Sequence, residues 1–288
     1  MGKEKVNKGR IAYYEGLTEK RGDRIEWTGK VNFVPEALQI PLKRKKHTTY
    51  FVNSMSDLFH ENVTDEQIDQ IFAVMALAPQ HIFQILTKRP KRMYEYIANL
   101  EERRGDNFIN WWTKTTDKIY DRLPEIFTEK YLEVASQCKI LTPLPNVWLG
   151  TSIENQKAAD DRLPWLVKTP AAVRFISAEP LLEEIDLRDV NEVVCYLEKE
   201  IVEKGWDVKK RGAWEDYEFL HDIHWIIAGS ESGTNARPMN EDWVRSLRDQ
   251  CVETDTAFFY KQKATAGGKK ISMPELDGKI WAEMPKTP

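Results

Sequence analysis

Six short apolar runs, rich in Val, Ile and aromatic residues, each break off into polar or charged side chains. Carboxylates at such positions can bind a metal ion, accept hydrogen bonds from ribose hydroxyls or pair with a substrate ammonium group, whereas lysine and arginine bind phosphate or carboxylate. A single polar cluster after one run is weak evidence for a binding site. Polar clusters after all six runs together indicate one. The polar side chains are Asn53, Ser54, Ser56, Asp57, Thr87, Lys88, Arg89, Thr151, Ser152, Glu154, Ser177, Glu179, Ser230, Glu231, Ser232, Lys261, Gln262 and Lys263.

Three carboxylates, Glu154, Glu179 and Glu231, hold comparable positions after three successive runs. Metal binding, ribose binding and ammonium binding all remain open for them, as does the plainer role of a solvated or helix-capping glutamate. Lys88 and Arg89 place two cations where an anionic group of a substrate can bind. The stretch 229–233 (Gly-Ser-Glu-Ser-Gly) lets backbone approach a ligand, but it is no dinucleotide fingerprint, and the chain contains no P-loop.

His60 is the best acid/base candidate among the five histidines, because it lies beside Glu61 just after the first polar cluster. A capping or packing role is the commoner use of such a residue. The sequence assigns no residue a catalytic role.

The apolar runs have the length and composition of strands buried on both faces of a parallel sheet. Amphipathic helical patterns lie between them, over 65–77, 90–100, 156–167 and 240–252, with Thr64 or Asp65 as an N-cap and an interruption or bend near Pro164. Alternating strands and helices predict an α/β fold, a partial (β/α) barrel, whose polar strand ends meet at one mouth. We expect a single domain over residues 1–288 with two peripheral helical insertions, 101–143 and 190–222.

Composition bounds the class of protein. The charged fraction of 31% and the formal net charge of −4 are ordinary for a soluble protein and give no support to a nucleic-acid surface. Cys138, Cys195 and Cys251 lie far apart, so neither a disulfide framework nor a local metal motif is visible, and no metal ligand is predicted. No apolar stretch has the ~20 residues that a membrane helix needs, and the N-terminus is charged, so we expect a cytoplasmic protein without a membrane partner.

The chain resembles a phage- and plasmid-associated family of uncharacterised proteins similar to radical S-adenosylmethionine enzymes. The resemblance runs from about Trp27 to Gln262. The motifs that carry it are 53–60, 86–90, 146–150, 177–182, 228–233, 236–239 and 243–251. It implies a partial barrel that holds a [4Fe–4S] cluster and S-adenosylmethionine, whose reductive cleavage gives a 5′-deoxyadenosyl radical.

The resemblance, together with the polar strand ends, implies two groups of binding residues. The cofactor-binding group is Ser54, Ser152, Glu154, Glu179, Ser230 and Glu231. The substrate-binding group is Asn53, Asp57, His60, Lys88, Arg89 and Lys261. Glu231 and Ser230 would face the methionyl or ribose groups, and Lys88 and Arg89 an anionic substrate.

The chain departs from the family at the cluster ligands. Members carry three cysteines on a loop after the first strand, and no such spacing exists here. The segment up to about Leu17 resembles the family's sequence after that loop. We therefore expect an N-terminally truncated form that lacks the first strand and the cluster ligands.

Two functions follow from these observations. The first is a radical-SAM-like enzyme, truncated here, that in full form cleaves S-adenosylmethionine at a [4Fe–4S] cluster to modify an unknown substrate, with a nucleotide or nucleic acid as one candidate. The alternative is a cluster-free barrel that binds a nucleotide or a protein partner at its mouth. A conventional barrel hydrolase using Glu154 and Glu179 has no motif behind it.

Overall fold

The computed structural model describes residues 15–22, 24–103, 115, 121, 143–188, 190, 222–233, 236–265 and 269–286. The contacts divide the chain into two compact units. The first takes residues 1–48, 59–81 and 104–139, and the second takes 49–58, 82–103 and 140–288. The predicted insertions, 101–143 and 190–222, lie almost wholly outside the described residues.

The elements of the first unit whose bounds the structure describes include a two-stranded antiparallel sheet and two helices. A hairpin joins β1 to β2 with its turn near Gly22, and α3 begins with a capping box. Thr64 Oγ1 accepts from Gln67 N (3.3 Å), and Gln67 Oε1 accepts from Thr64 N (3.1 Å), which confirms Thr64 as the N-cap. The elements are β1 (Thr18–Arg21), β2 (Arg24–Trp27), the 3₁₀ turn η1 (Pro35–Leu38), α2 (Gln39–Lys43) and α3 (Asp65–Leu77).

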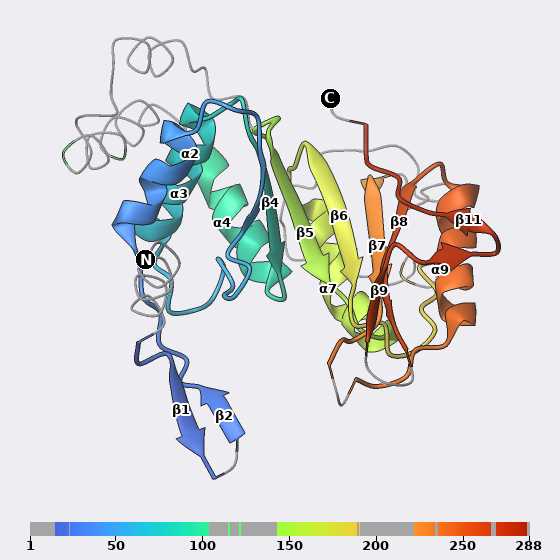
Figure 1. The fold of residues 1–288 in the computed structure, drawn as a ribbon. Helices are drawn as coiled ribbons and strands as arrows, with labels where there is room; N and C mark the ends of the chain where they lie inside the picture. The colour runs from blue at the N-terminus through green and yellow to red at the C-terminus, as the bar shows by residue number, and fades with distance from the viewer. Residues whose placement is uncertain are drawn as a thin grey trace, which may run out of the picture. The chain divides into compact units, whose positions relative to one another are not determined.

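The second unit is built on a curled seven-stranded sheet with the order β3-β4-β5-β6-β7-β8-β9 (Figure 1). Strands β3 to β8 are parallel, and β9 runs antiparallel to β8. This half-barrel confirms the predicted α/β architecture. Its strands are β3 (Thr49–Val52), β4 (Ile82–Thr87), β5 (Val147–Ser152), β6 (Val173–Ala178), β7 (Trp225–Gly229), β8 (Ala257–Ala264) and β9 (Lys270–Ser272).

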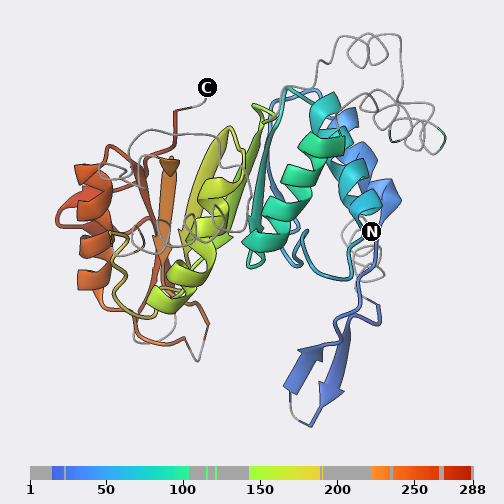
Figure 2. The same ribbon diagram turned by 180° about the vertical axis from the view of Figure 1, so that it is seen from behind.

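In the described part of the second unit, helices follow β4, β5 and β7. They are α4 (Pro90–Arg103), α7 (Gln156–Lys168) and α9 (Glu241–Glu253), and a small hairpin of β10 (Glu275–Leu276) and β11 (Lys279–Ile280) follows the sheet. Helices α4 and α7 cover one face of the sheet, as the two opposite views show (Figures 1 and 2). The expected interruption at Pro164 is wrong, because α7 continues through it to Lys168. Burial of Leu163, Leu166 and Val167 on the sheet offsets the missing backbone hydrogen bond.

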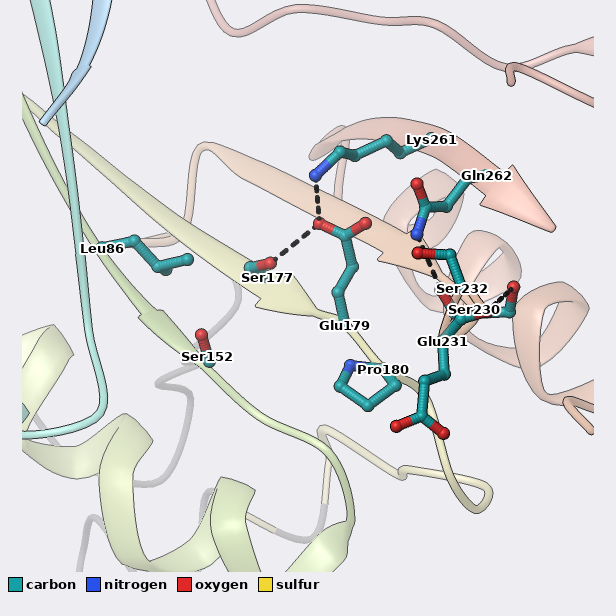
Figure 3. Close-up of a pocket in the computed structure, with 10 residues that line it drawn as sticks. All are labelled: Leu86, Ser152, Ser177, Glu179, Pro180, Ser230, Glu231, Ser232, Lys261 and Gln262. Carbon is teal, nitrogen blue, oxygen red and sulfur yellow. Dashed lines mark hydrogen bonds and ion pairs between the residues drawn. The ribbon is translucent and has the colours of Figure 1, made fainter. Parts of the chain in front are cut away.

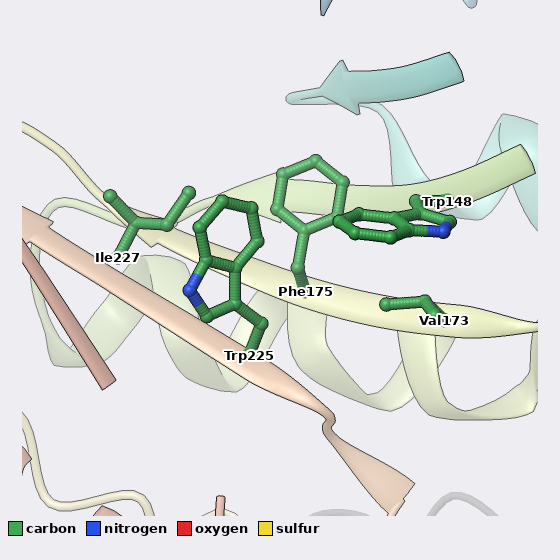
Figure 4. Packing of buried hydrophobic residues seen from close by; sticks show 5 residues of the cluster. All are labelled: Trp148, Val173, Phe175, Trp225 and Ile227. Carbon is green, nitrogen blue, oxygen red and sulfur yellow. The ribbon is translucent and has the colours of Figure 1, made fainter. Parts of the chain in front are cut away.

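The opposite face, which we call the inner face, carries an aromatic layer (Figure 4). Its buried members are Trp148, Val173, Phe175, Trp225 and Ile227. Trp225 meets Trp148 edge-on at 6.1 Å between ring centroids and lies 5.9 Å from Phe175. Because side chains alternate along a strand, the next inner-face positions beyond this layer are Ser152, Ser177 and Gly229. The layer therefore forms a dry floor directly below the polar strand ends.

Gly150 lies in this layer, where the ring of Phe175 takes the space of a side chain. An ideal Cβ at Gly150 would lie 2.6 Å from three ring carbons of Phe175. Any larger residue must therefore displace the ring, which packs against Trp225 and cannot move freely.

The C-terminal segment covers the far edge of β8. Tyr260 N donates to Trp281 O (2.9 Å), Glu283 N donates to Phe258 O (3.0 Å), and Trp225 Nε1 donates to Glu283 O (2.9 Å). With β9 on the second half of the strand, β8 is paired along its length, which protects the backbone next to the site. None of the helices in the described part of the chain is long and apolar enough to cross a membrane. The cytoplasmic location stays a prediction.

We expect Gly150→Ala to lower the free energy of unfolding by about 1–3 kcal/mol, the usual cost of overpacking. Urea denaturation of the purified chain measures it. In a Phe175→Leu background, where the ring is gone, the same substitution should cost much less. An equal cost in both backgrounds would contradict the contact between Gly150 and the Phe175 ring.

Candidate functional site

An open pocket of about 330 Å³ lies at the carboxyl ends of the parallel strands (Figure 3). Strands β4, β5, β6 and β8 and the segments that follow β6 and β7 supply its lining. The lining residues are Leu86, Ser152, Ser177, Glu179, Pro180, Ser230, Glu231, Ser232, Lys261 and Gln262. Five of the twelve predicted binding residues are therefore gathered in one pocket: Ser152, Glu179, Ser230, Glu231 and Lys261.

Glu179 is the most buried carboxylate of the pocket. Its Oε2 accepts hydrogen bonds from Ser177 Oγ (3.1 Å) and Lys261 Nζ (2.9 Å) (Figure 3). The Glu179 side chain is 14% exposed, whereas that of Lys261 is 52% exposed. Its Oε1 is buried and has no hydrogen-bond partner in the described part of the chain. A buried carboxylate oxygen without a donor costs free energy, so the two bonds to Oε2 and the packing around the side chain must offset that cost.

Gly229 makes this position of Glu179 possible. An ideal Cβ at Gly229 would lie 2.7 Å from Glu179 Oε1 and 3.3 Å from its Cγ. The carboxylate thus lies directly against the backbone of β7, in space that any other residue would fill. Glycine is needed here for the close approach of the Glu179 side chain, whereas the approach of a ligand to the 229–233 backbone stays a prediction.

Ser230 and Gln262 join the ends of β7 and β8. Ser230 N donates to Gln262 O (3.1 Å), and Gln262 Nε2 donates to Ser230 O (2.8 Å). Ser230 Oγ accepts from Ala264 N (2.7 Å) and donates to Glu231 O (3.0 Å). The polar atoms of Ser230 are therefore engaged in the backbone of the strand ends, and its hydroxyl positions the loop.

Glu231 is held by Arg237 across a short loop. Its Oε2 accepts from Arg237 N (3.0 Å) and Arg237 Nε (2.9 Å), and its Oε1 accepts from the guanidinium at 3.2 Å. These bonds lower the pKa of Glu231 to about 2, so the carboxylate stays ionised throughout the physiological range.

Glu154 is the third predicted carboxylate, and it joins two cations. Arg162, on α7, donates to both of its oxygens (2.9 and 3.3 Å) and also to Ser152 O (2.7 Å). Lys88 Nζ lies 3.6 Å from Glu154 Oε2 and is 52% exposed. Burial raises the pKa of Glu154, but the hydrogen bonds and charges of Arg162 and Lys88 outweigh it, so the pKa lies below its ordinary value. Lys88 therefore brings a second cation to a carboxylate that Arg162 already neutralises.

Asp57 accepts hydrogen bonds from three consecutive residues at the end of β4 and in the turn before α4. Its carboxylate accepts from Thr87 Oγ1 (2.7 Å), Lys88 N (3.1 Å) and Arg89 Nη1 (3.1 Å). Arg89 is thus neutralised by Asp57, while the ammonium of Lys88 turns towards Glu154. Asp57 orients the pair of cations that the sequence singled out.

The remaining predicted residues lie elsewhere. Asn53 has a left-handed backbone (φ 57°) and accepts from Ser56 N (3.0 Å) in a tight turn, and Ser54 is exposed. Neither is among the residues that line the pocket. His60 belongs to the first unit, where its Nδ1 accepts from Asn62 N (3.1 Å) and its Nε2 lies 3.5 Å from Glu61 Oε1.

The described residues do not fit a [4Fe–4S] cluster. Cys251 is buried on α9, and burial, followed by the charge of Glu283, raises the pKa of its thiol well above the ordinary range. Cys138 and Cys195 lie outside the described residues. No three His, Cys, Asp or Glu side chains in the described ranges are grouped so as to hold a metal ion.

Sequence reasoning missed the two arginines that organise the carboxylates. Arg162 lies eight residues after Glu154, and Arg237 lies six residues after Glu231. An arginine soon after each strand-end glutamate was the available signal. This signal is weak, because the conformation of the segment between the arginine and the glutamate determines whether the two side chains come into contact.

Comparisons with known proteins place the chain in one group. A family described as "Protein of unknown function (DUF5131)" matches residues 5–285. No curated protein and no solved structure matches the chain.

The ion pair between Glu231 and Arg237 should make the stability of the protein depend on pH. Because its folded pKa is depressed, the contribution of this pair to stability is present above pH 4.5 and is lost as the pH falls towards about 2. We expect Arg237→Gln to return the pKa of Glu231 towards 4.5, as measured by carboxyl ¹³C shifts in an NMR titration.

Arg245→Gln is the matched control, because Arg245 pairs with Asp242 and Asp277 on and beside α9 and should leave the titration of Glu231 unchanged. A Glu231 pKa that stays near 2 in Arg237→Gln would show that the pairing does not exist in solution.

Proposed function

We propose that the chain, which belongs to the DUF5131 family of proteins of unknown function, binds S-adenosylmethionine in its strand-end pocket as part of a radical-SAM-like protein. The binding step is what the described residues support. The phage association and the radical chemistry that the resemblance implies are part of the same proposal.

Glu179 is the single observation that carries this proposal. A carboxylate that is 14% exposed, with one oxygen buried and unpartnered among the described residues, lies on the floor of the pocket. A buried polar group without a partner calls for an explanation, and a bound ligand is one that also accounts for the pocket beside it. A ligand with an ammonium group or vicinal hydroxyls would supply the donors that Glu179 lacks, once the carboxylate moves off the backbone of β7 or exchanges its lysine partner on Oε2.

The rest of the pocket offers complementary chemistry. The hydroxyls of Ser152 and Ser177 and the amide of Gln262 can bond to ribose or to the carboxylate of an amino acid. Leu86 and Pro180 provide apolar surface for a base. S-adenosylmethionine combines an ammonium group, a carboxylate, a ribose and a purine in one molecule of a size suited to such a pocket.

A bound [4Fe–4S] cluster would supply the reductive cleavage of S-adenosylmethionine. The described residues contain no ligand set for it, so no step through a cluster is derived. For the substrate, Lys88 is the better of the two predicted cations, since Asp57 neutralises Arg89 and Arg162 already neutralises Glu154. We expect the substrate to carry a phosphate or carboxylate that Lys88 binds, as a nucleotide or nucleic acid does.

The alternative is a cluster-free barrel that binds a nucleotide. Nucleotide binding would use the same pocket residues and would need no iron–sulfur cluster. Anaerobic reconstitution with iron and sulfide distinguishes the two. A stoichiometric cluster would support the radical-SAM reading, and tight nucleotide binding by a chain that takes up no iron would support the alternative.

We expect Glu179→Gln to weaken the binding of S-adenosylmethionine roughly ten- to a hundredfold, because it removes the charge from a hydrogen bond worth about 1.5–3 kcal/mol. Isothermal titration calorimetry under anaerobic conditions measures it. Glu184→Gln, an exposed glutamate beyond the pocket, is the matched control and should change nothing. No binding by the unaltered chain, or equal binding by the Glu179 and Glu184 variants, would refute the proposal.

A further inference from the structure

We propose that Lys261 competes with the ligand for Glu179. The ammonium group of Lys261 pairs with the Glu179 carboxylate before the ligand binds, and the ammonium group of the ligand replaces it on binding. This inference rests on the proposed function, because it assumes that an ammonium-bearing ligand enters the pocket. It makes Lys261 a residue that determines which class of ligand the pocket accepts.

The two oxygens of the Glu179 carboxylate differ in their partners, and Oε2 is the one that is hydrogen-bonded. It accepts from Ser177 Oγ at 3.1 Å and Lys261 Nζ at 2.9 Å (Figure 3). A serine hydroxyl and a lysine ammonium therefore occupy the reachable side of the carboxylate already. A ligand cation that approaches from the pocket meets Lys261 first.

The other oxygen of Glu179 is out of reach of a ligand. Oε1 is buried, and it lies 2.7 Å from the position of an ideal Cβ on Gly229. A ligand cannot reach it while the carboxylate rests against β7. The ligand must therefore either replace Lys261 on Oε2 or draw the carboxylate away from Gly229, and both require the ion pair with Lys261 to yield.

Lys261 and Glu179 differ in how easily each can leave the ion pair. Lys261 is 52% exposed, so its ammonium returns to water with little rearrangement when it leaves Glu179. Glu179 is 14% exposed and cannot do the same. The buried member of the pair thus needs a cation at all times, and the exposed member is the one that can be exchanged.

Selectivity follows from this asymmetry. A ligand with an ammonium group replaces one cation by another, and the charge of Glu179 stays compensated. A neutral nucleoside has no cation to offer Glu179. It must either bind with Lys261 still in place or displace Lys261 and leave a buried carboxylate without a counterion, which costs free energy. The pocket should therefore prefer adenosyl amino acids to adenosyl compounds that lack the amino acid group.

The test compares S-adenosylhomocysteine, which has an α-ammonium group, with 5′-methylthioadenosine, which has none. We expect Lys261→Met to bind S-adenosylhomocysteine roughly tenfold more tightly than the unaltered chain, since the competitor is gone, and to bind 5′-methylthioadenosine unchanged. In a Glu179→Gln background the gain should vanish, because the two residues act on the same group.

Lys263→Met is the matched control. Lys263 lies two residues further along β8, pairs with Glu241 and does not line the pocket, so its loss should leave both affinities unaltered. The thermal midpoints of all variants report whether each one folds.

Weaker binding of S-adenosylhomocysteine by Lys261→Met would overturn the inference, because it would make Lys261 a direct ligand contact. An equal gain for both compounds, or a gain that persists with Glu179→Gln, would overturn it too. Failure of the unaltered chain to bind either compound would instead refute the proposed function, and the inference would fall with it.

Discussion

Where a strand of the curled sheet has glycine at Gly150 or Gly229, the side chain of a neighbouring segment fills the space on the inner face. Segment 173–179, strand β6 with its first turn residue, supplies both side chains. Phe175 fills the space at Gly150 on β5, and Glu179 fills the space at Gly229 on β7. The aromatic layer and the buried carboxylate thus have the same cause: in each, a side chain of segment 173–179 packs into the space left by a glycine of a neighbouring strand. The glycines determine where β6 can place its side chains.

The electrostatics of the mouth follow from this arrangement. A carboxylate pressed against β7 needs a counterion, and Lys261 supplies it from β8. The two other strand-end glutamates face more open surroundings and are held by arginines from their own following segments. Glu154 and Glu231 therefore stiffen the rim, while Glu179, the most buried carboxylate of the pocket, retains an unpartnered oxygen among the described residues. This difference in depth and pairing singles out Glu179 from three glutamates that look equivalent in the sequence.

Much of the fold is predictable from the chain, because the signals are periodic and local. The apolar runs became parallel strands, and the helical patterns at 65–77 and 156–167 became α3 and α7 within a residue or so. The gathering of strand-end residues into one pocket also follows from parallel topology. The pairing of charges does not. Lys261 and Glu179 are 82 residues apart, and no local pattern signals which lysine of β8 faces inwards. The burial of Glu179 depends on a missing Cβ in another strand, which only the packed structure reveals.

A crystal structure of the chain with S-adenosylhomocysteine tests the central claim most directly. We predict the ligand in the strand-end pocket, with its ammonium group within hydrogen-bond distance of Glu179 and with Lys261 turned away into solvent. A ligand bound elsewhere, or a pocket that stays empty at a saturating concentration while Glu179 and Lys261 remain paired, would contradict the account.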